Sequence, residues 1–286
     1  MNNIIPNLTD KKVVFHLIKN FKIRLSKKLG QNFLINDNVA RDIVASANIT
    51  KDDTILEIGT GIGALTQKLA ETEAEIITVE LDRSLLSILE KTLEPYKNVR
   101  IIHGDILKLD LNQEIPNKRY KVVANLPYYI TTPIILSLLE KKLPMELFVV
   151  MIQKEVAERI VAEPNSKTYG ALSIAIQYYT VPEIMFTVSN KSFIPEPGVE
   201  SAVLRCTLRD TPPVDVKDEQ LFFKTVRSSF AQRRKTLFNN LKAAGIDKDQ
   251  IPQILSKADI DGTRRAEQLS IEEFARISNA WFDLLK

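Results

Sequence analysis

The chain has few cysteines and histidines, the residues on which disulfide-linked and many metal-binding proteins depend. Its 286 residues include one cysteine, Cys206, and two histidines. An internal disulfide is therefore excluded, and neither histidine has a partner at the spacing of a metal site. A lone cysteine in an apolar strand pattern is typical of a small buried side chain in a reducing compartment. We expect no metal ion and a cytoplasmic location.

Long apolar runs are also missing. The longest, such as residues 147–152, have the length of a strand, whereas a membrane-spanning helix needs about 20 apolar residues. The first residues include Asp10, where a signal peptide would be apolar, so we expect neither export nor contact with a membrane. The 44% hydrophobic content suffices for one large domain and a small one.

Positive charge is clustered rather than abundant. A net charge of +3 alone gives no argument for a nucleic-acid partner. Residues 11–28, however, carry no acid, and a second basic cluster lies near residue 230. Each cluster alone is compatible with a solvated face, but together they predict a surface for phosphates. The basic residues are Lys11, Lys12, Lys19, Lys22, Arg24, Lys27 and Lys28 in the first cluster, and Arg227, Arg233, Arg234 and Lys235 in the second.

Strand and helix patterns alternate from residue 52 onward, which predicts an α/β fold with a doubly wound, mostly parallel sheet. Two late strands have no helix between them, so we expect an antiparallel hairpin at the sheet edge. The predicted strands are 54–58, 75–80, 99–103, 120–124, 146–152, 183–188 and 201–208, and the predicted helices are 64–71, 84–93, 133–141, 154–162 and 170–179.

Proline-rich residues 210–216 predict a linker. Beyond it the apolar residues have helical spacing and predict three to five short helices. We therefore expect a basic arm over residues 1–24, a large domain over 25–210 and a helical domain over 211–286. The arm mixes apolar and basic positions, which is compatible with a helix that forms only on binding, and its structure stays open.

A glycine-rich turn follows the first predicted strand in the sequence Glu57-Ile58-Gly59-Thr60-Gly61. Gly59 and Gly61 allow a ligand to approach backbone N–H groups closely. Glu80, at the end of the second strand, is placed to accept from ribose hydroxyls, and Asp105, after the third, from an adenine amino group. Each acid also has an ordinary interpretation, as a solubilising residue or an Asx turn. The pattern fits a dinucleotide or S-adenosylmethionine equally well.

The sequence Asn125-Leu126-Pro127-Tyr128 follows the fourth predicted strand. Its side-chain and backbone oxygens can accept hydrogen bonds from an exocyclic amino group, while Tyr128 offers a stacking face. Taken alone, these residues also suit a turn that ends a strand. Since the ends of neighbouring parallel strands line one crevice, we expect this segment beside the cofactor.

Several of these motifs together resemble those of the adenine-N6 dimethyltransferases of small-subunit ribosomal RNA, whose relatives confer macrolide resistance by methylating large-subunit RNA. The resemblance covers nearly everything after Lys27. It is carried by Gly30-Gln31-Asn32-Phe33-Leu34, Glu57-x-Gly59-x-Gly61, Glu80-Leu81-Asp82, Gly104-Asp105, Asn125-Leu126-Pro127-Tyr128 and Phe193-x-Pro195-x-Pro197-x-Val199-x-Ser201-Ala202.

The resemblance implies a Rossmann-like methyltransferase that uses S-adenosylmethionine to dimethylate two adjacent adenines near the 3′ end of the 16S RNA during ribosome biogenesis. It implies catalytic roles for Asn125, Leu126, Tyr128 and Phe193, with Phe193 as a second aromatic wall. Without the resemblance, Phe193 is better explained as a packed core residue. The implied cofactor residues are Asn32, Leu34, Gly59, Gly61, Glu80, Asp105 and Asn125; the implied RNA contacts are Lys27, Lys28, Arg227, Arg233, Arg234 and Lys235.

The expected partner is small-subunit ribosomal RNA, within a pre-assembled 30S particle, bound by a monomer. Three alternatives remain: a resistance-type methyltransferase of large-subunit RNA, a nicotinamide-dependent oxidoreductase, and an RNA-binding assembly factor without activity. If the chain were a nicotinamide-dependent oxidoreductase, the Asn125 motif and the basic clusters would have no role.

Overall fold

The computed structural model describes residues 6–23, 30–115 and 119–285. The chain forms two compact units: the first consists of Met1–Ala157 and Glu183–Leu208, and the second of Glu158–Pro182 and Arg209–Lys286. The division after residue 208 lies close to the predicted linker. Residues 158–182 were expected in the large domain but cluster with the second unit, because their apolar side chains belong to its core.

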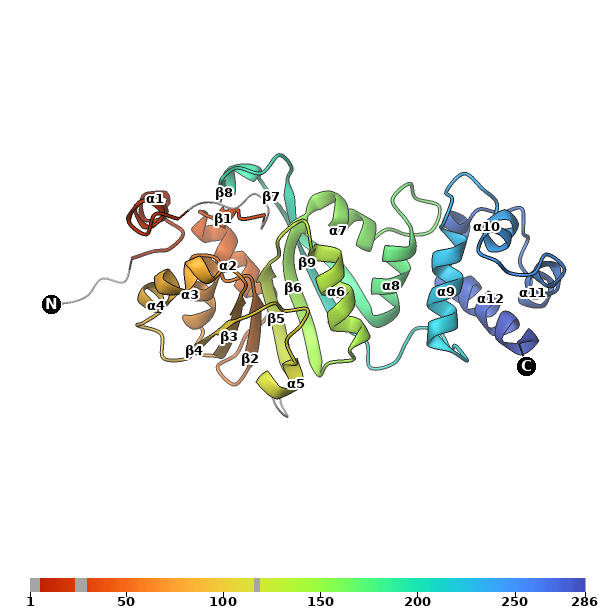
Figure 1. Cartoon of the computed structure of the whole chain (residues 1–286), viewed down its shortest axis with the longest axis horizontal. Coiled ribbons are helices and arrows are strands. Elements are labelled where there is room, and N and C mark those ends of the chain that lie inside the picture. The colour runs from red at the N-terminus through yellow and green to blue at the C-terminus, as the bar shows by residue number, and fades with distance from the viewer. Residues whose placement is uncertain (1–5, 24–29, 116–118, 286) are drawn as a thin grey trace. The chain divides into compact units, whose positions relative to one another are not determined.

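A seven-stranded sheet forms the centre of the first unit (Figure 1). The strand order is β4-β3-β2-β5-β6-β9-β7. Neighbouring pairs from β4 to β6 are parallel, whereas β9 runs antiparallel to β6. The strands are β2 (Thr54–Ile58), β3 (Glu75–Glu80), β4 (Val99–His103), β5 (Tyr120–Asn125), β6 (Met145–Gln153), β7 (Thr180–Val188) and β9 (Ser201–Leu208). The predicted mostly parallel sheet is confirmed.

The helices of this unit are α2 (Asp37–Ser46), α3 (Ala64–Ala70), α4 (Leu86–Thr92), α5 (Leu111–Glu114) and α6 (Thr131–Glu140), and α7 (Lys154–Ile160) spans the division after Ala157. Helices near α3, α4, α6 and α7 were predicted from the sequence, whereas α2 and α5 were not. Every residue of β2 is buried, which requires cover on both faces of the sheet. Cys206 in β9 is buried, as expected. The described ranges contain no helix that is both long and apolar enough to cross a membrane.

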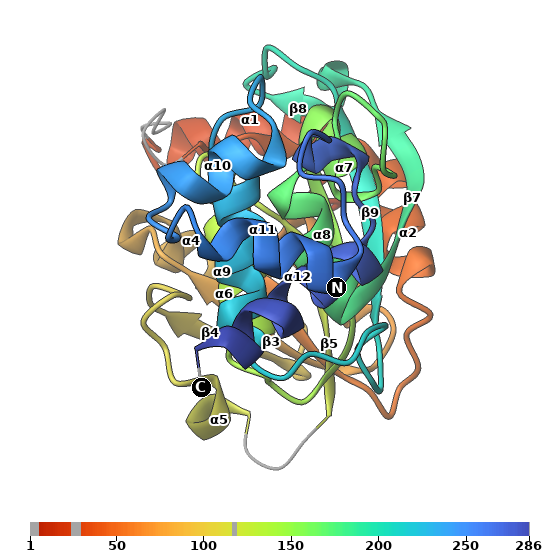
Figure 2. The same ribbon diagram turned by 90° about the vertical axis from the view of Figure 1, so that its right-hand side faces the viewer.

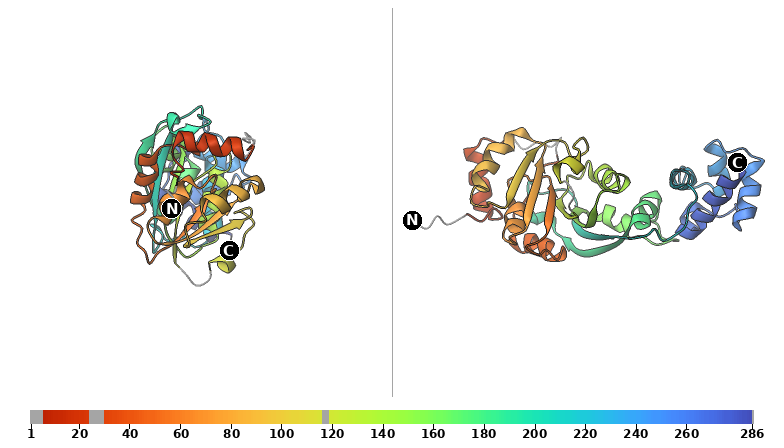
Figure 3. Two further views of the ribbon diagram at one scale, coloured as in Figure 1. Left: turned by 90° about the vertical axis from the view of Figure 1, so that its left-hand side faces the viewer. Right: turned by 90° about the horizontal axis from the view of Figure 1, so that it is seen from below.

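The amino-terminal arm is folded onto the first unit. Its helix α1 (Lys11–Asn20) is capped by the Asp10 carboxylate, which accepts from the N–H groups of Lys12 and Val13. Leu8 and Val14 are fully buried in a cluster with apolar residues of α4. Figure 3 shows α1 in red beside the helices that follow it. The arm therefore forms its helix within the isolated chain, because one side of the helix is apolar.

The second unit is helical, as predicted beyond the linker. Figure 2 shows its helices α8 (Ala171–Tyr179), α9 (Glu219–Ser229), α10 (Leu237–Ala243), α11 (Gln250–Ala258) and α12 (Ile271–Leu284). Their apolar faces form one core that includes Tyr178, Phe222 and Phe274. Tyr178 and Phe222 lie with ring centroids 5.1 Å apart.

A buried carboxylate joins β2 to its neighbours. Glu57 is 1% exposed, and its Oε2 accepts from the hydroxyls of Thr66 on α3 at 2.6 Å and Thr78 on β3 at 2.7 Å. The Thr78 hydroxyl also lies 2.6 Å from that of Thr60, in the turn after β2. Burial raises the pKa of Glu57 to about 8, although the two threonine hydrogen bonds act in the opposite direction. This cluster ties the turn to the sheet.

The raised pKa of Glu57 predicts a pH-dependent stability. Relative to the ordinary pKa of 4.5, the protonated form is favoured in the folded chain, so its contribution to stability is lost as pH rises toward about 8. Glu57→Gln removes this titration. We expect the unfolding midpoint of the variant, relative to the unchanged chain, to rise between pH 5 and pH 9 in thermal denaturation. Glu140→Gln, at an exposed site, is the control; equal pH profiles for Glu57→Gln and the unchanged chain would contradict the assignment.

Candidate active site

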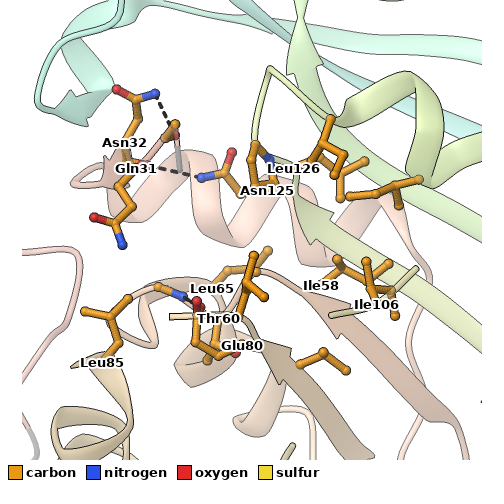
Figure 4. A pocket seen from close by; sticks show the side chains of 18 of the residues that line it. Gln31, Asn32, Ile58, Thr60, Leu65, Glu80, Leu85, Ile106, Asn125 and Leu126 are labelled. Carbon is orange, nitrogen blue, oxygen red and sulfur yellow. Dashed lines mark hydrogen bonds between the residues drawn. The ribbon is translucent and has the colours of Figure 1, made fainter. Parts of the chain in front are cut away.

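A cavity lies at the carboxyl ends of β2, β3, β4 and β5 (Figure 4). It includes about 1040 Å³ of space not filled by atoms, part of it open to solvent. The chain leaves β2 toward β3 on one side, and β5 pairs with β2 on the other. Such a switch point is where open α/β sheets bind ligands. Its walls are largely apolar, from residues such as Ile58, Leu65 and Ile106.

The turn after β2 forms one wall of the cavity. Gly59 and Gly61 have φ angles of +81° and +61°, a region that L-residues with side chains rarely adopt. A Cβ atom on Gly59 would lie 3.6 Å from the backbone oxygen of Asn125. The two glycines therefore allow the turn its left-handed conformation at the cavity wall. Their own N–H groups are paired within the protein, that of Gly59 with the Val79 backbone oxygen at 2.9 Å and that of Gly61 with Glu80 at 2.8 Å.

Glu80 lies at the end of β3 and is 6% exposed. Its Oε2 accepts from the Gly61 N–H at 2.8 Å and its Oε1 from the Asp82 N–H at 2.7 Å. Burial raises the pKa of Glu80, while these backbone hydrogen bonds lower it. Each carboxylate oxygen can accept more than one hydrogen bond. Glu80 can thus hold the turn and still accept from ribose hydroxyls.

Asp105 lines the same cavity after β4. Its Oδ1 accepts from the Leu107 N–H at 3.1 Å, so the Asx turn considered from the sequence is present. Its Oδ2 lies 3.8 Å from the ammonium group of Lys108, an exposed side chain. The carboxylate retains acceptor capacity, so the turn and an adenine contact are compatible.

The segment before α2 joins the two sides of the cavity. The Gln31 side chain donates to Asp82 at 2.6 Å, and the Asn32 backbone oxygen accepts from the Asn125 side-chain nitrogen at 3.4 Å. Asn32 and Leu34 both line the cavity. Figure 4 shows the amide of Asn125 directed toward Asn32.

The Asn125 motif forms the opposite wall. Because the Asn125 amide nitrogen donates to Asn32, its Oδ1 stays available as an acceptor. The Tyr128 hydroxyl lies 2.6 Å from that of Ser201, which fixes the tyrosine ring. Leu126 is 1% exposed and donates its N–H to Met151 at 3.1 Å. All three residues line the cavity, as the sequence predicts.

Phe193, predicted as the second aromatic wall, lies in a short strand next to the cavity residue Leu34. It belongs to the short strand β8 (Phe193–Ile194), which pairs antiparallel with β1 (Phe33–Leu34), and it lies opposite Leu34. Phe193 is 2% exposed and packs in the core with Val188 and Val203. The residues that line the cavity include Leu34 but not Phe193. In this structure Phe193 is a buried core residue opposite Leu34, and its role as a second aromatic wall for the target base stays a prediction.

Tyr129 is a cavity residue that the sequence analysis missed. It is 52% exposed, and its ring lies 3.2 Å from the position of a Cβ atom on Gly30. Partial burial, followed by the charges of Asp105 and Glu80, raises the pKa of Tyr129. Its position directly after Tyr128 was the available signal. Thr60 and Gln31 also line the cavity without having been singled out.

The predicted RNA-contact residues fall into three groups. Lys27 and Lys28 lie outside the described residues. Arg227, Arg234 and Lys235 are exposed on the second unit. Arg233 is exposed too, but its guanidinium pairs with Glu267 at 3.1 Å and donates to the Lys167 backbone oxygen. The described residues contain no group of three or more His, Cys, Asp or Glu side chains able to hold a metal ion.

Comparison with known proteins agrees with the cavity and the motifs around it. Residues 22–282 match the family described as ribosomal RNA adenine dimethylase. The chain is 50% identical over 277 residues to ribosomal RNA small subunit methyltransferase A of Lactococcus lactis, covering 94% of both chains. It is 50% identical over 273 residues to the protein of that name from a Geobacillus strain, covering 92% of this chain and 94% of the relative.

Solved structures share the fold. A dimethyladenosine transferase from Plasmodium falciparum is 25% identical, with a TM-score of 0.74 over 85% of this chain and 95% of that one. The 23S rRNA methyltransferase ErmE is 22% identical, with a TM-score of 0.66 over 87% of this chain and 99% of that one. The predicted Rossmann-like fold and family are confirmed: this chain belongs to the ribosomal RNA adenine dimethylase family.

Proposed function

We propose that this chain transfers methyl groups from S-adenosylmethionine to N6 of two adjacent adenines near the 3′ end of small-subunit ribosomal RNA, two methyl groups per base. The observation that carries this proposal is the cavity in which Glu80 and Asp105 face the Asn125 motif. Glu80 and Asp105 suit an adenosine-bearing cofactor, and the Asn125 motif suits an adenine with a free amino group. The relatives that are 50% identical to this chain are named for the small subunit, which supports small-subunit RNA rather than large-subunit RNA as the substrate.

The residues of the cavity fit S-adenosylmethionine. Glu80 and Asp105 would accept from its ribose hydroxyls and adenine amino group, Gly59 and Gly61 admit it close to the backbone, and Asn32 and Leu34 close the site. When bound, the cofactor supplies a methyl carbon already activated by a positively charged sulfur. The protein has mainly to align the acceptor nitrogen and exclude water.

The nitrogen is the difficult partner, because its lone pair is delocalised into the adenine ring. The Asn125 Oδ1 and the Leu126 backbone oxygen would accept from the two amino protons and favour the pyramidal nitrogen that attacks. Asn32 holds the Asn125 amide, so these acceptors are oriented before the base enters. Preorganised contacts of this kind contribute a few kcal/mol, roughly, to a transition state.

The target base would be turned out of its RNA helix and stacked on Tyr128, whose ring is held by Ser201. A base–aromatic stack contributes about 1 to 3 kcal/mol. The substrate we propose is RNA within a pre-assembled 30S particle, bound by a monomer in the cytoplasm. The exposed Arg227, Arg234 and Lys235 supply charges for its phosphates.

The function is tested by transfer of labelled methyl groups. We expect label from S-adenosylmethionine to enter small-subunit particles taken from cells that lack this protein, and mapping to place dimethyladenosines at two adjacent positions. Label in large-subunit RNA would favour the resistance type. Binding of RNA without transfer would favour an assembly factor, and calorimetric binding of a nicotinamide cofactor instead of S-adenosylmethionine would favour an oxidoreductase.

Two variants separate the walls of the cavity. Asn125→Ala removes an acceptor for the target amino group, so we expect transfer to fall by about 30-fold or more, an acceptor being worth about 2 kcal/mol or more. Cofactor affinity, measured by calorimetry, should change much less. Glu80→Gln is the matched variant, and we expect its main effect to be a weaker affinity for the cofactor. Comparable losses in both assays for Asn125→Ala would show that Asn125 mainly binds the cofactor.

The second basic cluster is tested by the salt dependence of RNA binding. Arg234→Gln should reduce the slope of log affinity against log salt by about one, because one phosphate contact is lost. Arg233→Gln is the comparison, since this arginine is already paired with Glu267; we expect a smaller change in slope and a lower unfolding midpoint. An unchanged slope for Arg234→Gln would exclude it as a phosphate contact.

A further inference from the structure

The outer side of α1 carries exposed positive charge, part of it at a helix end where it does not stabilise the fold. Lys11, Lys12 and Lys19 are exposed. The first two begin the helix, where no acidic residue lies in the first turn and where positive charge opposes the helix dipole. The Asp10 carboxylate already accepts from two backbone N–H groups. The folded chain therefore keeps two cations, Lys11 and Lys12, at a helix end where the helix dipole disfavours positive charge, whereas Lys19 lies in the last turn, where the dipole favours it.

The inner side of the arm is held firmly in place. The Leu8 N–H donates to the Gln67 side-chain oxygen at 2.9 Å, and the Gln67 side-chain nitrogen donates to the Pro6 backbone oxygen at 3.0 Å. The Thr9 hydroxyl lies 3.1 Å from the Asp37 carboxylate. With Leu8 and Val14 fully buried, the cations are presented from a fixed position.

One layer of apolar side chains lies between α1 and the cavity. The apolar cluster beneath α1 includes Phe33, Ile62 and Leu85, and all three also line the cavity. On the α4 side, the Lys91 ammonium lies 5.2 Å from the centroid of the Phe21 ring, which packs against this cluster. The basic surface thus lies on the opposite side of these wall residues from the cofactor site.

The surface also carries an exposed aromatic ring. Phe15 is 50% exposed, and the Lys11 ammonium lies 5.9 Å from its ring centroid. Cations next to an exposed ring suit a nucleic-acid strand, which offers phosphates and base faces together. An anionic membrane fits less well, because the apolar side of α1 is already buried against α4 and cannot enter a bilayer.

We propose that the outer side of α1, formed by Lys11, Lys12, Phe15 and Lys19, is an RNA-docking surface that holds the phosphate backbone outside the catalytic cavity. This rests on the proposed function and deepens it. The lysines contribute affinity and orientation without reading sequence, while the cavity selects the adenine. The RNA would be held by the arm while successive methyl transfers take place in the cavity.

The test combines Lys11→Gln, Lys12→Gln and Lys19→Gln in one full-length variant. We expect the slope of log affinity against log salt, for ribosomal RNA or 30S particles, to fall by about 2 to 3. The affinity for S-adenosylmethionine should stay unchanged. Replacement of the same lysines by arginine should keep the slope. Gln keeps high helix propensity at these exposed positions, so circular dichroism should show an intact fold.

The matched control combines Lys51→Gln, Lys97→Gln and Lys141→Gln. These exposed lysines precede β2, β4 and β6, so they lie at the end of the parallel strands away from the cavity. The same change in slope for both triple variants, or no change for the α1 variant, would overturn the proposal. Loss of binding to anionic phospholipid vesicles with an unchanged RNA slope would overturn it in favour of a membrane.

The failure of this inference differs from that of the proposed function. If the unchanged chain methylates small-subunit RNA but both triple variants bind RNA alike, only the docking surface is wrong. If the unchanged chain transfers no methyl group to ribosomal RNA, the proposed function itself is wrong.

Discussion

The carboxylate of Glu80 is the interaction on which the cavity depends. One oxygen accepts from the Gly61 N–H in the turn after β2, and the other from the Asp82 N–H after β3. Both loops would otherwise leave a backbone donor unpaired, which is costly where the surroundings are buried. A single side chain therefore sets the distance between two loops and remains available to accept from a ligand.

Further hydrogen bonds connect these loops to the substrate side of the cavity. Asp82 accepts from Gln31, and the neighbouring Asn32 accepts from Asn125. The segment that leads into the domain thus connects the loop that would hold the cofactor to the residue that would hold the target base. Because the Asn125 nitrogen is used in this way, its oxygen is the atom left for the substrate. Alignment of the two reactants is built into one network rather than into two independent sites.

Local patterns explain how much of this could be predicted. The strands 54–58, 75–80, 99–103 and 201–208 have the predicted bounds, since apolar runs and their connections define them without distant contacts. The site residues at their ends follow from sheet geometry. Phe193 does not, because the two-residue β8 is too short for periodicity to decide which way a side chain points, and its partner strand β1 lies far away in the sequence.

The arm and the second unit show the same limit. The docking of α1 depends on the contact between Leu8 and Gln67, which lie 59 positions apart in the chain. Residues 158–182 contain parts of two predicted helices, 154–162 and 170–179, and only the core that they join assigns them to the second unit. Hydrophobic spacing predicts that a helix has an apolar side, but it does not say which surface will cover it.

The distribution of charge predicts that affinity for RNA and selectivity for one base come from different parts of the chain. The cavity walls are mainly apolar and present a few fixed acceptors, so in the proposed function they would discriminate between bases but gain little from phosphates. The exposed cations of α1 and of the second unit can hold phosphates but do not distinguish one base from another. The proposed four methyl transfers at two adjacent bases would require the small cofactor to exchange repeatedly. Phosphate contacts outside the cavity can persist through that exchange, because no part of them has to leave with the spent cofactor.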